Sequence, residues 1–168
     1  GQLVDALVYA LKYKGSRQLI LRKTFPELEH SLIFASMRFY PKSACKYYAS
    51  HRMWKFLNGS IIEFGYCATK ADVLRYQGAE YDVVRFDELT HFTEEQYTYL
   101  MSRIRGVNPY PKMVKSSTNP GGIGHTWVKR RFIDGFEPNE VHTDEKTGTK
   151  RIFIPSFVQD NGFLMKSD

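Results

Sequence analysis

Hydrophobic residues recur along this chain at two spacings, one typical of amphipathic helices and one typical of short strands. Over residues 2–13 the spacing is three or four, which predicts a helix with one apolar face. That face is formed by Leu3, Ala6, Leu7, Ala10 and Leu11. No capping residue precedes this helix, so we expect it to begin before Gly1, in a fragment cut at its N-terminal side.

Short runs rich in aliphatic and aromatic residues predict strands. The runs are residues 18–22, 53–57, 60–66, 81–86, 112–116 and 150–155. Asn58 and Gly59 join the second run to the third, and this dipeptide is the strongest short signal for a hairpin.

Further segments are predicted to be helical, at residues 24–39, 69–76, 93–105 and 125–133. Thr24 and Thr93 are the predicted N-caps of two of them, and acidic residues follow each cap, where the helix dipole favours negative charge. Helices and strands alternate without a repeat or an internal linker. This order favours one α/β domain with a mainly parallel sheet flanked by helices, plus an antiparallel hairpin.

Polar side chains follow two of the predicted strands at the point where each strand ends. Asp87 and Glu88 come directly after residues 81–86, and the polar run 116–119 closes the strand at residues 112–116. Polar groups at the carboxyl ends of two neighbouring strands describe the active edge of an open α/β sheet.

The acid pair has a functional and a structural interpretation. In a nucleotide-hydrolysing site, Asp87 contacts Mg²⁺ through its water shell, and Glu88 orients and deprotonates the water that attacks the γ-phosphate. The alternative is a solvated, acidic start of the following helix. The apolar run before the pair and the capped helix that begins at Thr93 favour the first interpretation.

Ser117, Thr118 and Asn119 also have two interpretations. In isolation the run is a strand-to-turn transition, with residues 120–122 as the turn. One strand along from the acid pair, a hydroxyl or amide can hydrogen-bond the γ-phosphate or the attacking water and lose that bond after hydrolysis. The run is therefore a candidate sensor.

The net charge of +6 and the pI near 9.3 permit contact with a polyanion. The predicted helix at residues 125–133 carries Lys129, Arg130 and Arg131, which are candidates for contacts with nucleic-acid phosphates. The alternative is a solvated helical face with Trp127 packed inward.

The remaining charged residues and the cysteines carry less information. The basic pair at residues 22–23, and Arg103 with Arg105, are interpreted as surface charge. Cys45 and Cys67 lack metal-ligand spacing and suggest a reducing compartment. The chain has no signal peptide and no apolar run near the roughly 18 residues of a membrane span.

Four segments follow one another along the chain in an order that is more specific than any one of them. They are QLILRKTFPELEHS, YQGAEYDVVRFDEL, SSTNPGGIGHTWVKRRF and FIPSFVQDNGFL. Together they resemble the large terminase subunit of tailed bacteriophages, the family that packages viral DNA into a preformed capsid. The resemblance implies a RecA-like ATPase domain of the ASCE class of P-loop NTPases, truncated at its N-terminal side.

The resemblance also implies roles for individual residues. Asp87 matches the Mg²⁺-associated aspartate of the Walker B motif, and Glu88 matches the catalytic glutamate. Ser117, Thr118 and Asn119 match the coupling motif that links hydrolysis to the movement of DNA. ATP and Mg²⁺ are the implied substrate and metal.

Two parts of the family pattern lie outside residues 1–168. The glycine-rich phosphate-binding loop and its lysine precede the first helix in this family, and the nuclease domain follows the ATPase domain. The chain is therefore expected to be a partial ATPase domain that hydrolyses ATP poorly or not at all, since the missing backbone amides and lysine bind the β- and γ-phosphates.

The trans-acting arginine is a further departure from the family pattern. Some relatives place it just before the glycine at Gly78, where this chain has Gln77. Arg75 is the expected substitute, with Arg103 or Arg105 as weaker candidates. Such an arginine, supplied by a neighbouring subunit, raises the rate on the order of 10³ or more.

The implied partners are double-stranded DNA, a portal protein and a small terminase subunit. The family implies a homo-oligomeric ring in the cytoplasm of the bacterial host, without a membrane. A helicase-like ATPase acting on single strands is one alternative, although its further motor motifs and second RecA-like domain are not visible in this span. A basic DNA-binding module with a structural acid pair is the other.

Overall fold

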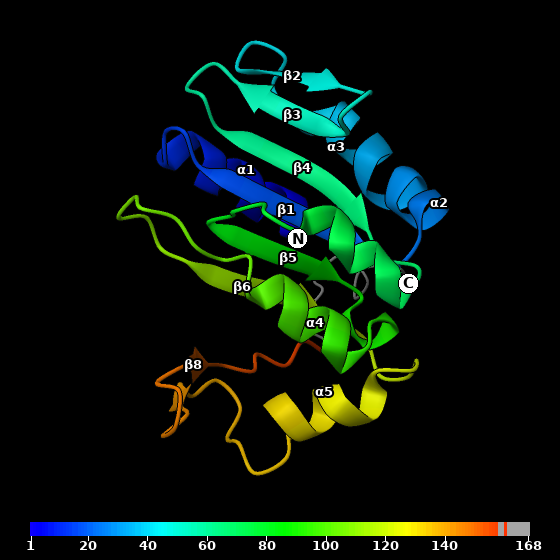
Figure 1. Ribbon diagram of the computed structural model, residues 1–168, viewed down its shortest axis with the longest axis vertical. Helices are drawn as coiled ribbons and strands as arrows, with labels where there is room; N and C mark the ends of the chain where they lie inside the picture. Colours follow the sequence, from blue (N-terminus) through cyan, green and yellow to red (C-terminus); the bar gives the residue numbers. More distant parts are fainter. Residues whose placement is uncertain (158–159, 161–168) are drawn as a thin grey trace. The chain divides into compact units, whose positions relative to one another are not determined.

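A computed structural model describes residues 1–157 and 160, and a six-stranded sheet is its largest element (Figure 1). The strands are β1 Arg17–Arg22, β2 Cys45–Tyr48, β3 Met53–Phe56, β4 Ile61–Tyr66, β5 Val83–Asp87 and β6 Met113–Ser117. Their order in the sheet is β2-β3-β4-β1-β5-β6. Strands β4, β1, β5 and β6 run parallel, and β2 and β3 add antiparallel pairs at one edge. The predicted mainly parallel α/β sheet with an antiparallel hairpin is confirmed.

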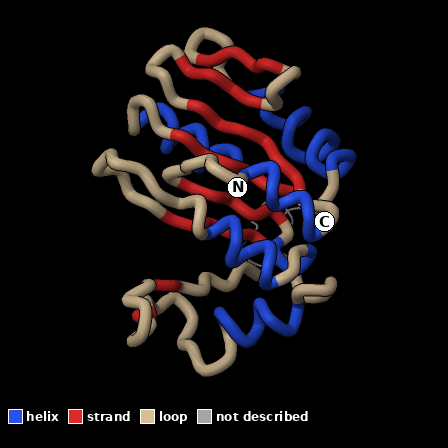
Figure 2. Tube along the Cα trace, in the orientation of Figure 1, coloured by secondary structure: helices blue, strands red, loops and turns tan. Residues whose placement is uncertain are grey.

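Helices cover both faces of this sheet. They are α1 Gln2–Lys12, α2 Phe25–Glu27, the π-helix η1 Leu28–Ile33, α3 Phe34–Phe39, the 3₁₀-helices η2 Lys70–Tyr76 and η3 Leu89–His91, and α4 Glu94–Met101. Successive residues of β5 point to opposite faces. Arg85 is ion-paired with Asp5 of α1, and the ring of Phe86 lies 5.3 Å from that of Tyr97 in α4. Figure 1 accordingly shows α1 behind the sheet and α4 in front of it, and Figure 2 shows helices on both sides of the strands.

Strands β1 and β5 are the two inner strands of the parallel part of the sheet, β4-β1-β5-β6, and are buried on both faces. Residues 19–21 of β1 and Val83, Val84 and Phe86 of β5 are fully buried. Parallel strands covered by helices on both faces need nearly continuous apolar runs, which both segments have. Arg85 interrupts the run in β5 and is itself completely buried.

The hairpin between β3 and β4 turns at Asn58 and Gly59, as predicted. Gly59 has a φ of +87°, in the left-handed region that glycine adopts without steric cost. The Phe56 N–H donates to the Ser60 carbonyl at 2.9 Å, which closes the turn. Asn58 Nδ2 donates to the Ala10 carbonyl at 2.9 Å and thereby ties the turn to α1.

The helix predicted over residues 93–105 is shorter than expected. Thr93 caps it as predicted, with its hydroxyl accepting from the Gln96 N–H at 3.2 Å, but α4 ends at Met101. Beyond that point the Tyr81 N–H donates to the Arg103 carbonyl at 2.9 Å, and the Arg105 N–H donates to the Tyr81 carbonyl at 3.1 Å. The chain leaves the helix because residues 103–105 pair beside Tyr81 instead.

Two other segments also differ from the prediction. Residues 25–39 are helical throughout, but their middle, Leu28–Ile33, is a π-helix, and the Thr24 hydroxyl donates to the Glu27 carboxylate at 2.9 Å. Strand β2 was not predicted. Its inward Cys45 and Tyr47 alternate with exposed residues, but four residues at a sheet edge are too few for a clear period of two.

The chain divides into two compact units, Gly1–His125 and Thr126–Asp168. The second contains nearly all of α5, which spans His125–Phe132, and a ladder of β7 (His142–Thr143) and β8 (Lys150–Arg151). Within residues 1–157 and 160, no helix is long and apolar enough to cross a membrane.

The strand predicted over residues 150–155 is wrong in length. β8 ends at Arg151 because its partner β7 has only two residues, and the Phe153 carbonyl accepts from the Asn139 N–H at 2.8 Å. The last of the four terminase-like segments, residues 153–164, lies partly outside the described residues.

Cys45 and Cys67 are free thiols in the interior of the first unit. Burial raises the pKa of both thiols, and raises that of Cys67 to about 12. Both side chains therefore stay protonated at neutral pH, and they behave as small apolar groups.

Candidate active site

The acid pair lies at the carboxyl end of β5, the strand between β1 and the edge strand β6. Asp87 is the last residue of the strand, and Glu88 leaves it with φ 60° and ψ 63°, in the left-handed region. A non-glycine residue in this conformation costs roughly 1–2 kcal/mol, and such residues cluster at functional sites. The tight turn η3 follows immediately, with Leu89 and Thr90 buried. Asp87 and Glu88 therefore have different backbone conformations, one extended and one left-handed.

Asp87 contacts side chains from both neighbouring strands. Ser117 Oγ donates to Asp87 Oδ1 at 2.8 Å, and the Arg22 guanidinium forms an ion pair with Oδ2. The register explains this meeting, since Asp87 is paired with Ser117 and the preceding Phe86 is paired with Leu21. Three adjacent strands thus bring a cation, an acid and a hydroxyl together.

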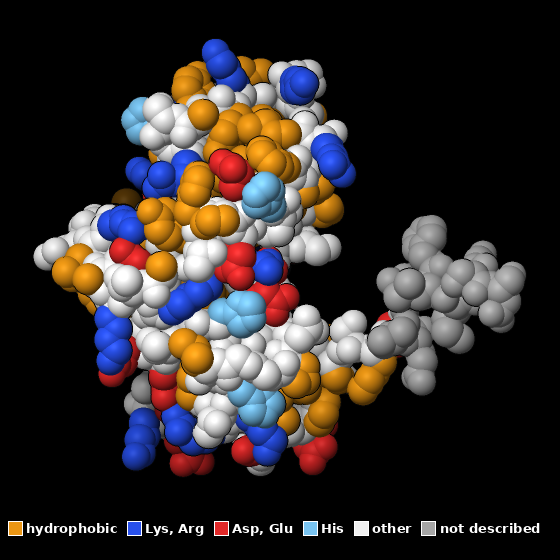
Figure 3. Space-filling model, turned by 90° about the vertical axis from the view of Figure 1, so that its right-hand side faces the viewer, with side chains coloured by type: hydrophobic (Ala, Val, Ile, Leu, Met, Phe, Trp, Pro, Cys, Tyr) orange, Lys and Arg blue, Asp and Glu red, His pale blue; other side chains and the backbone are white. Residues whose placement is uncertain are grey.

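Figure 3 shows the molecule from the side on which the parallel strands end, and acidic and basic side chains lie next to one another on this face. Arg22 and Asp87 are mostly shielded, with side-chain exposures of 18% and 17%. The interpretation of Arg22 as surface charge is therefore wrong. Arg22 follows Leu21, the residue that pairs with Phe86, and it therefore lies beside Asp87. This position cannot be recognised in the sequence until β1 is known to lie beside β5.

Asn119 reaches the second carboxylate of the pair. Its Nδ2 lies 3.5 Å from Glu88 Oε1, at the outer limit of a hydrogen bond. The structure therefore brings Ser117 to Asp87 and Asn119 to Glu88, so the two halves of the predicted site meet.

Thr118 contacts the turn behind Glu88 rather than the acids. Its Oγ1 accepts from the Thr90 N–H at 3.2 Å, and Thr90 Oγ1 donates to the Asn119 carbonyl at 3.1 Å. The Gly124 N–H donates to the Thr90 carbonyl at 2.6 Å. Thr90, which the sequence pattern does not single out, thus holds the loop at residues 118–124 against η3.

Gly122 is needed for this close contact. It has a φ of +83°, and a Cβ at this position would lie 2.8 Å from the Thr90 carbonyl oxygen. Real Cβ atoms do not approach backbone so closely, so another residue here would push the loop off η3.

The donor set at Asp87 fits a magnesium ion held through water. Mg²⁺ prefers oxygen ligands and keeps several of its waters, and Asp87 and Ser117 supply oxygen atoms side by side. Within the described part of the chain, no group of three or more His, Cys, Asp and Glu side chains is placed to hold a metal ion. A single carboxylate can hold Mg²⁺ when waters and substrate phosphates supply the remaining ligands.

The candidate trans-acting arginines are engaged away from the acid pair. Arg75, on η2, has Nη2 2.6 Å from Asp72 Oδ1 and its guanidinium 4.1 Å from the ring centre of Tyr66. The guanidinium of Arg103 lies 5.2 Å from the ring centre of Tyr99. Arg75 would have to leave these contacts to reach a neighbouring subunit, and its role stays a prediction.

Arg105, the other weaker candidate, is held by a long ion pair. Its Nε is 3.8 Å from Glu80 Oε1, and both side chains are more than half exposed. An exposed pair at this distance contributes little to stability, so Arg105 is held only loosely.

Helix α5 has the predicted arrangement of an inward aromatic and outward charges. Trp127 is buried, and Lys129 and Arg130 are exposed. Lys129 Nζ lies 3.0 Å from Asp134 Oδ1, and the Arg131 carbonyl accepts from Arg151 at 3.1 Å. This arrangement suits a solvated face and a DNA-contacting face alike.

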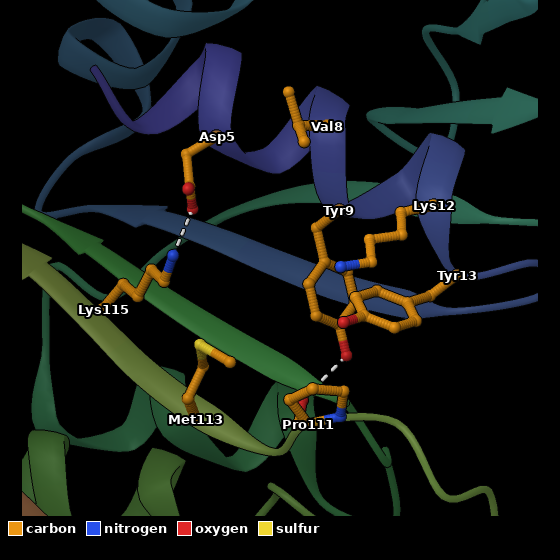
Figure 4. Close-up of a pocket in the computed structure, with 8 residues that line it drawn as sticks. All are labelled: Asp5, Val8, Tyr9, Lys12, Tyr13, Pro111, Met113 and Lys115. Carbon is orange, nitrogen blue, oxygen red and sulfur yellow. Dashed lines mark hydrogen bonds and ion pairs between the residues drawn. The ribbon is translucent and has the colours of Figure 1, made fainter.

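A groove of about 230 Å³ lies between α1 and β6, and its lining does not include the acid pair (Figure 4). It is lined by Asp5, Val8, Tyr9, Lys12, Tyr13, Pro111, Met113 and Lys115. Lys115 Nζ lies 2.7 Å from Asp5 Oδ2, and the Tyr9 hydroxyl donates to the Pro111 carbonyl at 2.8 Å. These contacts bridge helix and strand, and we assign the groove a structural role.

The comparison with known proteins agrees with this geometry. The family model of the phage terminase large subunit matches residues 3–168, nearly the whole chain. No curated protein matches the chain. The six-stranded, mainly parallel sheet flanked by helices is compatible with the RecA-like ATPase fold of that family. The chain belongs to the family of phage terminase large subunits.

Proposed function

We propose that this chain is part of the ATPase domain of a DNA-packaging motor, which couples ATP hydrolysis to movement of double-stranded DNA into the capsid. Membership of the terminase family supports a role in phage DNA packaging. The observation that carries the proposal is the contact of Asp87 and Glu88 with Ser117 and Asn119 at the ends of adjacent strands.

Each residue of the pair has its own role in this proposal. Asp87 holds the water shell of Mg²⁺, and the metal, when bound, neutralises charge on the β- and γ-phosphates. Glu88 accepts the proton of the attacking water and orients it toward the γ-phosphate. Asn119 senses whether that water and phosphate are present, a role supported by its Nδ2 lying 3.5 Å from Glu88 Oε1.

The run at residues 117–119 transmits a movement of the Asp87 and Glu88 carboxylates to the loop that follows it. Ser117 contacts Asp87, and Thr118 contacts Thr90 in the turn behind Glu88. A shift of Asp87 after hydrolysis therefore changes the hydrogen bond of Ser117, directly before the loop at residues 118–124, and a shift of Glu88 changes that of Asn119 within the loop.

The remaining parts of the motor are proposed from the family. A phosphate-binding loop upstream of residues 1–168 supplies phosphate contacts, Arg75 acts in trans on a neighbouring subunit, and Lys129, Arg130 and Arg131 contact DNA phosphates. The working motor is a homo-oligomeric ring in the host cytoplasm, and its partners are the portal protein and the small terminase subunit.

The test is DNA-stimulated ATP turnover by a longer terminase chain that carries the phosphate-binding loop. Glu88→Gln should abolish nearly all turnover while thermal unfolding stays unchanged. Glu95→Gln is the matched control, because Glu95 is an exposed acid of α4 paired with Lys70 at 2.8 Å. Turnover that persists in Glu88→Gln would move the chemistry off the acid pair and favour a basic DNA-binding module.

A distinction from a helicase-like ATPase needs a second substrate. The packaging proposal expects double-stranded DNA to stimulate turnover more than single-stranded DNA of the same length. Stronger stimulation by single strands would favour the helicase-like alternative.

A further inference from the structure

We propose that Arg22 gates the metal site at Asp87. Its guanidinium is paired with the carboxylate, and binding of the metal with its nucleotide displaces it onto a phosphate oxygen. The proposal rests on the proposed role of Asp87 as the metal-associated acid.

Both oxygens of Asp87 are occupied in the structure. Ser117 donates to Oδ1, and the Arg22 guanidinium pairs with Oδ2. The two side chains of the ion pair are both more than four-fifths shielded from solvent. A metal that binds at this carboxylate therefore meets a cation that is already in place.

A guanidinium and a hydrated magnesium ion compete for one carboxylate. Both are cations, and a positive charge held at Asp87 disfavours a second one beside it. Removal of the Arg22 charge should therefore strengthen metal binding, the opposite of what loss of a structural side chain does.

The destination of the displaced guanidinium follows from its position and its chemistry. Arg22 Nε is buried and has no hydrogen-bond partner within residues 1–157 and 160. Arginine offers five N–H donors in a planar fork that suits phosphate oxygens. The phosphates are the anions that arrive together with the metal, so they can take over the guanidinium when Asp87 releases it.

Lys23, the other member of the basic pair, has a different environment. Its Nζ donates to Gln96 Oε1 at 3.1 Å, and burial lowers the pKa of Lys23. Gln96 is itself buried and donates to the Cys67 and Thr69 carbonyls. The gate is therefore assigned to Arg22 alone, which contacts the acid directly.

The first measurement is Mn²⁺ binding to the 168-residue chain, followed by electron paramagnetic resonance without nucleotide. Arg22→Gln should bind Mn²⁺ about tenfold more tightly than wild type, the factor expected for removal of one competing charge-assisted hydrogen bond. Asp87→Asn should bind weakly, and adding Arg22→Gln to it should not restore binding.

Arg17→Gln is the matched control, because it removes the same charge at the opposite, exposed end of β1. It should leave Mn²⁺ affinity within about twofold of wild type, since charges separated by more than a Debye length of about 8–10 Å are largely screened. Thermal unfolding of each variant checks that the fold is retained.

The second measurement is affinity for AMP-PNP in the presence of Mn²⁺, in the longer chain with the phosphate-binding loop. Here Arg22→Gln should weaken binding about tenfold, because the variant cannot form the charge-assisted hydrogen bond to phosphate. Opposite signs in the two measurements distinguish a gate from a merely structural arginine, whose removal would weaken both.

The outcomes separate this inference from the proposed function. Mn²⁺ binding that is indifferent to Asp87→Asn would overturn the metal site and with it the proposed role of Asp87. Binding that requires Asp87 but is no tighter in Arg22→Gln than in Arg17→Gln would overturn the gate alone. Tighter Mn²⁺ binding with unchanged AMP-PNP affinity would overturn the transfer to phosphate.

Discussion

The completely buried guanidinium of Arg85 is ion-paired with the carboxylate of Asp5, which is 46% exposed. Arg85 Nε also donates to Gln18 Oε1 at 2.9 Å, and Lys115 shares the Asp5 carboxylate. The pair joins α1 to β5 two residues before Asp87. The buried positive charge of Arg85 thus holds α1 against β5, the strand that carries the acid pair.

Asp5→Asn is expected to destabilise the fold by about 2 kcal/mol. Removing one partner of a buried pair leaves an uncompensated charge, which costs about 3–5 kcal/mol when both partners are buried, and the half-exposed Asp5 reduces this. Urea unfolding at pH 7 measures the change. Glu95→Gln, which breaks an exposed pair, should change stability by less than about 1 kcal/mol, and an equal change in the two variants would contradict the prediction.

The same pair predicts a pH dependence. Burial alone would raise the pKa of Asp5, but the hydrogen bonds and charges of Lys115 and Arg85 outweigh it and hold that pKa below its usual value of 3.8. A carboxyl with a lowered folded-state pKa contributes stability above its unfolded-state pKa and loses it as the pH falls through the folded-state value. The unfolded-state pKa of an Asp carboxyl is about 3.9. As the pH falls from about 5 to about 3, wild type should therefore lose more stability than Asp5→Asn. Parallel curves of urea midpoint against pH would exclude this role.

Glu63 predicts the opposite dependence. Burial raises the pKa of Glu63, although the Tyr81 hydroxyl donates to it at 2.9 Å. A raised folded-state pKa means that the contribution of Glu63 is full below its unfolded-state pKa and is lost as the pH rises through the folded-state value. Glu63→Gln should thus be more stable than wild type at pH 7, by an amount that vanishes near pH 4. Thermal unfolding at both pH values, with exposed Glu80→Gln as the control, tests this expectation.

Gly122→Ala should loosen the loop at residues 118–124 and lower DNA-stimulated ATP turnover in the longer chain. Gly121→Ala is the control, because Gly121 also has a positive φ, of +102°, but nothing lies within 4 Å of its Cβ position. Both substitutions carry a backbone cost of about 1–2 kcal/mol, and only Gly122→Ala also collides with Thr90. Hydrogen exchange at the Gly124 amide should be faster, and ATP turnover lower, in Gly122→Ala than in Gly121→Ala. Equal effects in the two variants would show that the close approach of Gly122 to Thr90 has no role.

The basic residues of α5 predict how the affinity for DNA depends on salt concentration. If Lys129, Arg130 and Arg131 neutralise DNA phosphates, replacing all three with Gln should reduce the slope of log affinity against log salt by about 0.9 for each phosphate that is no longer neutralised. Fluorescence anisotropy with a double-stranded oligonucleotide at several salt concentrations measures this slope. The control replaces three exposed lysines of the β2–β3 region, Lys42, Lys46 and Lys55. Equal slopes in the two triple variants would remove α5 from the DNA-binding surface.

The centre of the fold could be predicted from sequence because its constraints are local. The apolar runs of β1 and β5 indicate buried strands, and Asn58-Gly59 marks the hairpin. The ends of elements could not be predicted in the same way. Residues 103–105 leave α4 to pair with Tyr81, a partner more than 20 positions away, and no local preference reveals that pairing.

The residues of the candidate site also divide into those that could be predicted from local sequence and those that could not. Asp87, Glu88 and the run at residues 117–119 stand out because they end strands, and their meeting follows from parallel pairing. Arg22 does not stand out, since its ion pair requires β1 to lie beside β5. Thr90 could not be predicted because its role is to bind backbone groups of a loop 28 or more positions away.

The two interior cysteines have a practical consequence. Maleimide dyes react with thiolates, and the pKa of about 12 at Cys67 leaves that thiol almost entirely protonated at neutral pH. Cys45 is also buried with a raised pKa. The chain has no other cysteine, so one cysteine introduced on an exposed helix gives a single labelling position in an otherwise unaltered protein. Fluorescence energy transfer between a dye at that position and labelled DNA then measures whether the chain binds DNA.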